Sequence, residues 1–135
     1  MKGYLFDATS LIEVLRAAPT RGFVRKLATV PSAERWTSAT SVGDLFYFAR
    51  RVNNQALMND LLKLVSAVRV LPFDLAAAHM YSKLVASVDW AGSSLSATDL
   101  MTVALARTND LTLVTRRPHQ FQNLTQLRVE DWTTL

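Results

Sequence analysis

Short runs with the length of strands alternate with segments of helical periodicity, and this alternation limits the possible folds more than any other feature. The strand candidates are residues 3–6, 35–38, 69–73, 111–115 and 127–129. The helix candidates are residues 11–15, 23–27, 42–51, 57–68, 75–88 and 96–108, and Asp74 has the position of an N-cap before the fifth of them. This order predicts an α/β fold, a three-layer sandwich with a short, mainly parallel central sheet flanked by helices.

The length and hydropathy of the chain are those of one domain with a core of its own. Half of its 135 residues are hydrophobic, and no linker, repeat or low-complexity segment divides it, so we interpret residues 1–135 as a single domain. No apolar run approaches the roughly 18 residues of a membrane span. Asp7 interrupts the first apolar segment too early for a signal peptide. We therefore expect a soluble, cytoplasmic protein without a membrane partner.

Composition narrows the chemistry that this domain can perform. The chain has no cysteine, which excludes a disulfide scaffold, a thiolate zinc site and a cysteine nucleophile. With only two histidines, any metal site must use mainly oxygen ligands, which suit Mg²⁺, Mn²⁺ or Ca²⁺. The formal net charge of +4 favours a polyanionic partner such as nucleic acid.

Three acids stand where chemistry is plausible, and the first of them lies at the carboxyl end of a strand, where a parallel α/β sheet binds its ligands. Asp7 directly follows the first strand, whereas Asp44 and Asp99 lie in the first turns of two apolar helices. Carboxylates that converge on one point repel each other, and a bound divalent cation relieves that repulsion. Thr115 and Arg117 follow the clearest late strand and are expected at the same edge.

Helix capping explains the same acids without a metal. The spacing of the capping box occurs three times, at Ser10–Glu13, Ser41–Asp44 and Ser96–Asp99. Asp7 also has the position of an N-cap after its strand. Both interpretations stay open here, because spacing alone cannot show that three residues meet in space.

Five blocks of the sequence resemble, in order, those of the PIN-domain family. They are YLFDATSLIEVLR, TSATSVGDLFYFARR, LPFDLAAAHMYSKL, the pattern G-x-x-L-x-x-x-D-L-x-x-V-A-L-A from Gly92 to Ala106, and LTLVTRRPHQFQNLTQLRVEDW. Each block is loose alone, but the ordered set covers nearly the whole chain. The similarity is greatest to the small VapC-type toxins of prokaryotic toxin–antitoxin pairs.

This resemblance implies a metal-dependent endoribonuclease. Acids that match Asp7, Asp44 and Asp99 hold Mg²⁺ or Mn²⁺ in the family, and Thr9 matches a polar position beside the first acid. Thr115 and Arg117 are the expected supporting residues. The implied partners are a structured RNA substrate such as tRNA or rRNA, a cognate antitoxin that blocks the site, and a second copy of the chain in a homodimer.

The sequence departs from the family pattern in two places. The second acid is most often Glu in the family, and Asp44 is one methylene shorter. Arg117 and Gln120 stand where the family often carries further polar or acidic residues, so a fourth carboxylate is missing. Arg117 has two possible roles, because its planar fork can hold a substrate phosphate or pair with one of the acids.

Two other functions remain open on the sequence alone. The missing acid allows a catalytically degenerate PIN domain that acts as an RNA- or protein-binding module. An acid at a strand end, Asp7, also allows a receiver-like phosphoacceptor. The absence of a lysine after the late strand, where Thr115-Arg116-Arg117 stands, opposes this last function.

Overall fold

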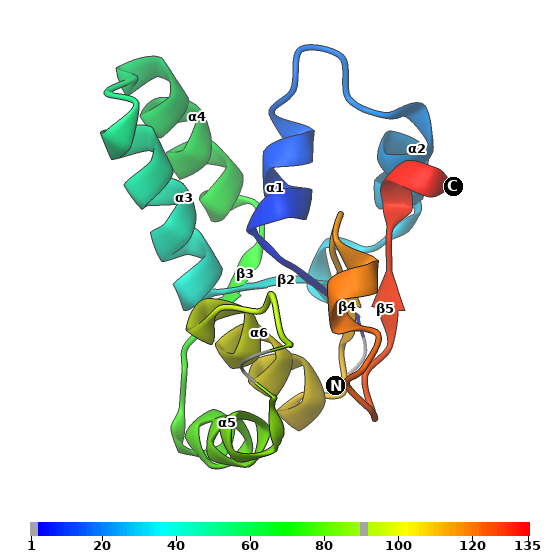
Figure 1. The fold of residues 1–135 in the computed structure, drawn as a ribbon. Coiled ribbons are helices and arrows are strands. Elements are labelled where there is room, and N and C mark those ends of the chain that lie inside the picture. The colour runs from blue at the N-terminus through cyan, green and yellow to red at the C-terminus, as the bar shows by residue number, and fades with distance from the viewer. Residues whose placement is uncertain (1–2, 90–91) are drawn as a thin grey trace.

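The computed structural model describes residues 3–89 and 92–135 and has a five-stranded parallel sheet at its centre (Figure 1). The strands are β1 (Tyr4–Phe6), β2 (Arg35–Ser38), β3 (Arg69–Leu71), β4 (Thr112–Val114) and β5 (Val129–Glu130). Their order in the sheet is β3-β2-β1-β4-β5, and each neighbouring pair is parallel. The predicted α/β architecture is confirmed, although the last strand begins two residues later than expected.

Six α-helices flank the sheet. They are α1 (Ala8–Val14), α2 (Arg21–Thr29), α3 (Ala39–Arg51), α4 (Gln55–Ser66), α5 (Leu75–Ser87) and α6 (Ala97–Thr108). Short 3₁₀ turns follow β4 at Pro118–Phe121 and close the chain at Trp132–Thr134. In the described part of the chain, no helix is both long and apolar enough to span a bilayer.

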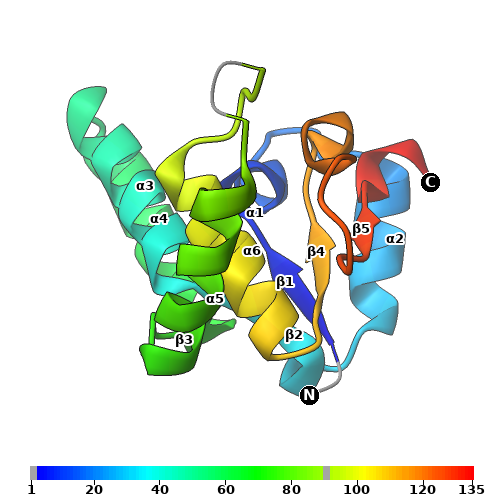
Figure 2. The same cartoon turned by 60° about the horizontal axis from the view of Figure 1, so that its bottom comes forward.

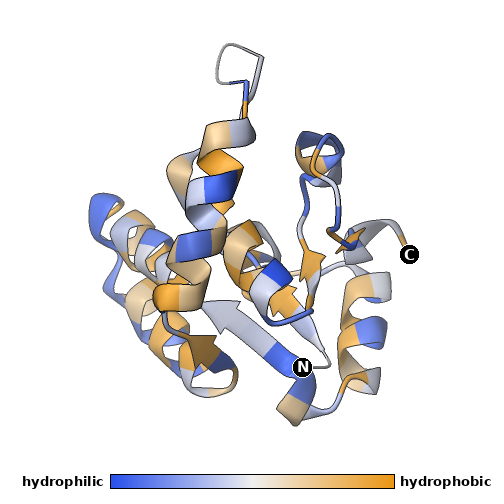
Figure 3. Cartoon of the chain, turned by 90° about the horizontal axis from the view of Figure 1, so that it is seen from below, coloured by the Kyte–Doolittle hydropathy of each residue, from blue (hydrophilic) through white to orange (hydrophobic). Residues whose placement is uncertain are grey.

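Alternate side chains of the central strands point to opposite layers, as a strand requires. Phe6 packs with residues of α1 to α4 on one face, whereas its neighbour Leu5 packs with α5 and α6 on the other. Val114 and Leu113 divide in the same way. Figure 2 shows α5 and α6 together in front of β1, and Figure 3 shows hydrophobic and polar residues alternating around the covering helices.

The connections between strands decide where the sheet has a crevice. The chain starts in the middle of the sheet and moves outward through β2 to β3, with α1 to α4 on one face. It then crosses back over the other face, through α5 and α6, to β4 beside β1. Such a reversal leaves a crevice at the carboxyl ends of β1 and β4, where α/β proteins bind ligands.

Two of the three capping boxes expected from the sequence do not form. The N-cap of α3 is Ser38, whose hydroxyl accepts from the backbone N–H of Ser41 at 3.0 Å, so Asp44 has no capping role there. The N-cap of α1 is Asp7, which accepts from the Ser10 N–H, so Glu13 is not in a capping box. In both cases the helix begins three residues earlier than the Ser pattern indicates. The third box, Ser96 with Asp99, is present.

Candidate active site

Asp7 is a buried carboxylate at the carboxyl end of the central strand, with 5% of its surface exposed. Its Oδ1 accepts hydrogen bonds from the Thr9 hydroxyl at 2.6 Å and from the Ser10 N–H at 3.0 Å. Its Oδ2 is buried and has no hydrogen-bond partner within the described residues. Burial raises the pKa of Asp7, against the opposing effects of Thr115, Thr9, Ser10 and Arg117. The cation that lies near this unpartnered oxygen is the guanidinium of Arg117, whose Nη2 is 3.9 Å away.

Asp99 lies in the first turn of α6 and serves two purposes at once. Its Oδ2 accepts from the backbone N–H of Ser96 at 2.9 Å, which completes the capping box. Its Oδ1 accepts from Nη2 of Arg117 at 2.8 Å. Capping and a site role therefore do not exclude each other at this residue, because each uses a different carboxylate oxygen.

Arg117 occupies the space between the two carboxylates that come from different elements. The same Nη2 that contacts Asp99 lies 3.9 Å from the unpartnered Oδ2 of Asp7. Its Nη1 donates to Oε1 of Gln120 at 2.8 Å. The guanidinium of Arg117 thus lies where a metal cation would neutralise the two carboxylates. This agrees with the interpretation of the sequence in which Arg117 pairs with one of the acids.

Asp44 lies on the exposed surface at the first half of α3. Partial burial of its carboxyl and then the negative charge of Asp99 raise the pKa of Asp44 above its ordinary value. This coupling places Asp44 in the electrostatic field of Asp99. Among residues 3–89 and 92–135, however, no group of three or more Asp, Glu or His side chains has the geometry of a metal site. The assignment of Asp7, Asp44 and Asp99 as metal ligands therefore stays a prediction.

A chain of hydroxyl groups holds the loop after β4 against Asp7. The Thr9 hydroxyl donates to Asp7 and accepts from the Arg116 N–H at 2.9 Å. The Thr115 hydroxyl lies 3.4 Å from that of Thr9 and accepts from the Arg117 N–H at 3.1 Å. Thr9 and Thr115 therefore join the strand-end acid to the backbone that carries Arg117.

Glu13, whose spacing from Ser10 fits a capping box, also belongs to this arrangement. It is fully buried, and its Oε1 accepts from both the N–H and the hydroxyl of Thr20. Its Oε2 pairs with Arg16 at 3.0 Å and with Arg116 at 3.2 Å. Burial opposes the charged form, but the Thr20 and Arg16 contacts prevail and lower the pKa of Glu13 to about 2. Its place among Leu11, Ile12, Val14 and Leu15 was the signal available in the sequence.

Comparison with known proteins shows the family to which this fold belongs. The PIN-domain family model matches residues 4–124. Over 137 residues the sequence is 26% identical to a tRNA(fMet)-specific endonuclease VapC of Shigella flexneri, covering 98% of this chain and 100% of that protein. The chain belongs to the PIN-domain family, which excludes the receiver-like phosphoacceptor. Within the family it is of the VapC type, the endoribonuclease toxins of toxin–antitoxin pairs.

Solved structures show the same fold over almost the full length. A DNA-bound VapBC from Salmonella typhimurium aligns with a TM-score of 0.86 and 21% identity, over 98% of this chain and 99% of that chain. FitAcB from Neisseria gonorrhoeae aligns with a TM-score of 0.78 and 25% identity, over 98% and 99% of the two chains. PIN nucleases are typically metal-dependent.

Proposed function

We propose that this chain hydrolyses phosphodiester bonds of a structured RNA, such as tRNA or rRNA, with Mg²⁺ or Mn²⁺ bound at Asp7, Asp44 and Asp99. The name of the Shigella relative, a tRNA-specific endonuclease, supports this substrate class. The formal charge of +4 supports a polyanionic substrate. The observation that carries the proposal is the buried, unpartnered Oδ2 of Asp7 facing the carboxylate of Asp99 across the Arg117 guanidinium.

The donor set fits a hard divalent cation. Carboxylate oxygens are the ligands that Mg²⁺ and Mn²⁺ prefer, and Asp7 Oδ2 has no competing hydrogen bond in the described structure. Asp99 Oδ1 becomes available once Arg117 moves away, and Asp44 shares the field of Asp99. When bound, the metal would activate a water nucleophile and neutralise charge on the scissile phosphate.

The other polar residues of the site would position these groups. Thr9 holds Oδ1 of Asp7, which directs the remaining oxygen into the site. Thr115 fixes the backbone of Arg117. Once released from Asp99, the guanidinium of Arg117 would be free to bind a phosphate oxygen through its planar fork. The same side chain would therefore neutralise the acids in the free chain and hold RNA in the complex.

The cellular setting of the proposal follows from the family. We propose that residues 1–135 form one PIN-like domain, and the family match over residues 4–124 supports this. The VapBC structures that share its fold support a cognate antitoxin as partner. We also propose that the chain forms a homodimer. We expect it in the cytoplasm, where its RNA substrate is found.

The test is RNA cleavage by the chain purified free of any antitoxin. Total tRNA and rRNA are incubated with Mg²⁺, Mn²⁺ or EDTA, and the wild type is compared with Asp7→Asn. We expect cleavage by the wild type alone, and its loss in EDTA. Cleavage that persists in EDTA, or in the variant, would reject the metal-dependent site.

A second function has its own supporting observation. No ready-made metal site exists in the described residues, and Arg117 pairs with Asp99. These features suit a catalytically degenerate PIN domain that binds RNA or a protein without cleaving it. RNA binding by the folded chain in EDTA, with no cleavage under either metal, would favour this alternative.

A further inference from the structure

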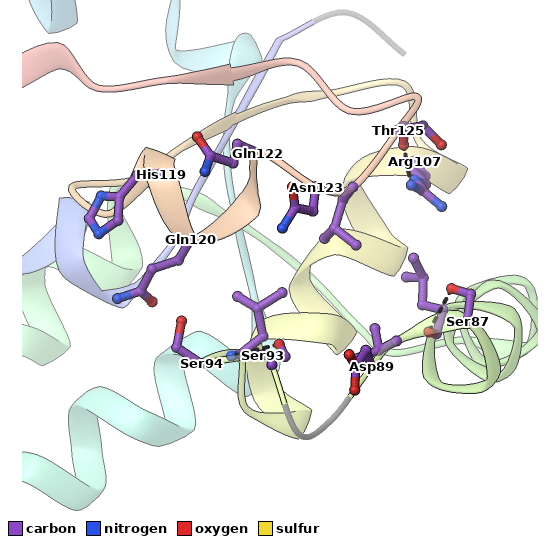
Figure 4. Close-up of a pocket in the computed structure, with 15 residues that line it drawn as sticks. Ser87, Asp89, Ser93, Ser94, Arg107, His119, Gln120, Gln122, Asn123 and Thr125 are labelled. Atoms are coloured by element: carbon purple, nitrogen blue, oxygen red, sulfur yellow. Dashed lines mark hydrogen bonds between the residues drawn. The ribbon is translucent and has the colours of Figure 1, made fainter.

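A pocket of about 700 Å³ lies beside the acidic site, between the end of α5, the segment that precedes α6, the last turn of α6 and the loop that follows β4 (Figure 4). Gln120 belongs to both places. Its side chain lines the pocket, and its Oε1 accepts the hydrogen bond from Arg117. Since Arg117 also donates to Asp99, one side chain separates the pocket from the proposed position of the scissile phosphate.

The walls of the pocket combine neutral polar groups, the charged side chains of Asp89 and Arg107, and an apolar floor. Figure 4 shows Gln120 and Asn123 extending from the loop after β4, and Ser94 on the opposite wall. Val88 and Leu124 contribute apolar surface. Within the described residues, nothing hydrogen-bonds to the Asn123 amide or the Ser94 hydroxyl, so both remain available to a ligand.

The distribution of charge disfavours a phosphate group as the occupant. Arg107 lies at the opposite end of the pocket from Gln120, and its guanidinium already donates to the backbone carbonyl of Thr125. At the end near Gln120, the polar groups are amides, the Ser94 hydroxyl and the imidazole of His119. Amides both donate and accept, as the edges of nucleobases require. The volume lies within the range of about 300–1,000 Å³ that is common for small-ligand sites.

We infer that this pocket binds one nucleobase of the RNA strand, next to the scissile phosphate, and thereby sets the sequence preference of cleavage. The inference rests on the proposed function. An apolar side chain of a protein partner is a poorer occupant, because it would bury the amides of Gln120 and Asn123 without partners. A nucleobase, in contrast, covers the apolar floor with its ring and offers hydrogen-bond partners to the amides of Gln120 and Asn123.

The test measures RNA binding in EDTA, where metal-dependent cleavage does not occur. Four fluorescein-labelled RNA octamers, each of a single base, are titrated with the wild type, Asn123→Ala and Ser94→Ala by fluorescence anisotropy. We expect the wild type to prefer one octamer by at least about fivefold. Each variant should weaken binding of that octamer by about 5–10-fold, the effect of one lost hydrogen bond, and leave the others unchanged.

The matched control is Asn59→Ala, which removes an amide from the exposed surface of α4 and should preserve the base preference. Equal binding of all four octamers, no binding of any, or an unchanged preference in Asn123→Ala would overturn the inference. Equal weakening of the binding of all four octamers would also overturn it, because that result indicates a contact with the sugar-phosphate backbone of the RNA and not with a base. A base preference without cleavage in the separate assay would reject only the proposed enzymatic function.

Discussion

Arg117 donates from Nη2 to Oδ1 of Asp99 at 2.8 Å, and so neutralises an acid that the proposed function requires as a metal ligand. The two residues lie on different elements, since Asp99 is in the first turn of α6 and Arg117 follows β4. Removal of this guanidinium should therefore change the affinity of the site for a metal ion.

We expect Arg117→Gln to bind Mn²⁺ about three- to tenfold more tightly than the wild type. The guanidinium and the metal compete for the same carboxylate, and a partly exposed ion pair of about 1 kcal/mol corresponds to about a fivefold change in affinity. Isothermal titration calorimetry with Mn²⁺ measures this effect. Arg51→Gln is the control, because it removes the same charge from the exposed end of α3. Equal or weaker Mn²⁺ binding by Arg117→Gln would show that the two cations do not compete.

Asp7→Asn should abolish cleavage without loss of stability. The substitution removes a proposed metal ligand, so activity should fall by about 100-fold or more. Loss of a residue that only hydrogen-bonds a metal ligand already costs up to about 100-fold, and loss of the ligand itself should cost at least as much. Asn is as good an N-cap as Asp, so the start of α1 is preserved. Because burial raises the pKa of Asp7, its charged form costs stability at pH above that raised pKa.

Urea unfolding at pH 7 and at pH 4 measures the stability of this variant. The free energy of unfolding of Asp7→Asn should equal or exceed that of the wild type at pH 7. Any advantage should shrink as pH falls, because the wild-type carboxyl then becomes protonated. A variant less stable than the wild type at pH 7 would contradict the assigned cost of the buried charge.

Asp44→Glu should strengthen Mn²⁺ binding. Asp44 is exposed on α3 and belongs to no group of acids with metal-site geometry in the described residues. A glutamate carboxylate reaches one methylene further from α3, and the family most often has Glu at this position, so we expect a several-fold gain in affinity. Asp60→Glu, the same change at an exposed position of α4, is the matched control. A loss of Mn²⁺ affinity on lengthening Asp44 would show that the aspartate already reaches the metal.

Glu13→Gln should destabilise the fold by about 2 kcal/mol at pH 7, the value of a buried hydrogen bond to a charged group. The pKa of Glu13 is about 2 in the folded chain against an ordinary 4.5. The stabilisation is therefore complete above pH 4.5 and declines as pH falls toward 2. Denaturant unfolding of both chains across this pH window checks the prediction.

Asp60→Asn serves as the control for Glu13→Gln, because it removes an acid from the exposed surface of α4. Its free energy of unfolding should follow that of the wild type throughout. If the difference between wild type and Glu13→Gln stays constant down to pH 2, the buried network does not depend on the charge of Glu13.

Local patterns in the sequence determined most of the fold. Apolar runs and helical spacing located each strand and helix to within a few residues, because both depend on neighbours close in the chain. Capping signals at Asp74 and Ser96 were correct for the same reason. Parallel strands also bring their carboxyl ends to one edge, which placed Asp7 and Arg117 together before any contact was known.

Contacts between distant segments were decided by the tertiary structure alone. Glu13 pairs with Arg116, and Asp99 with Arg117, only because the sheet order brings β4 beside β1 and α6 onto the sheet. Ser38 replaced Ser41 as the cap of α3 because β2 ends where that helix begins. No local pattern contains this information, since side-chain pairing across the sheet depends on which strands become neighbours.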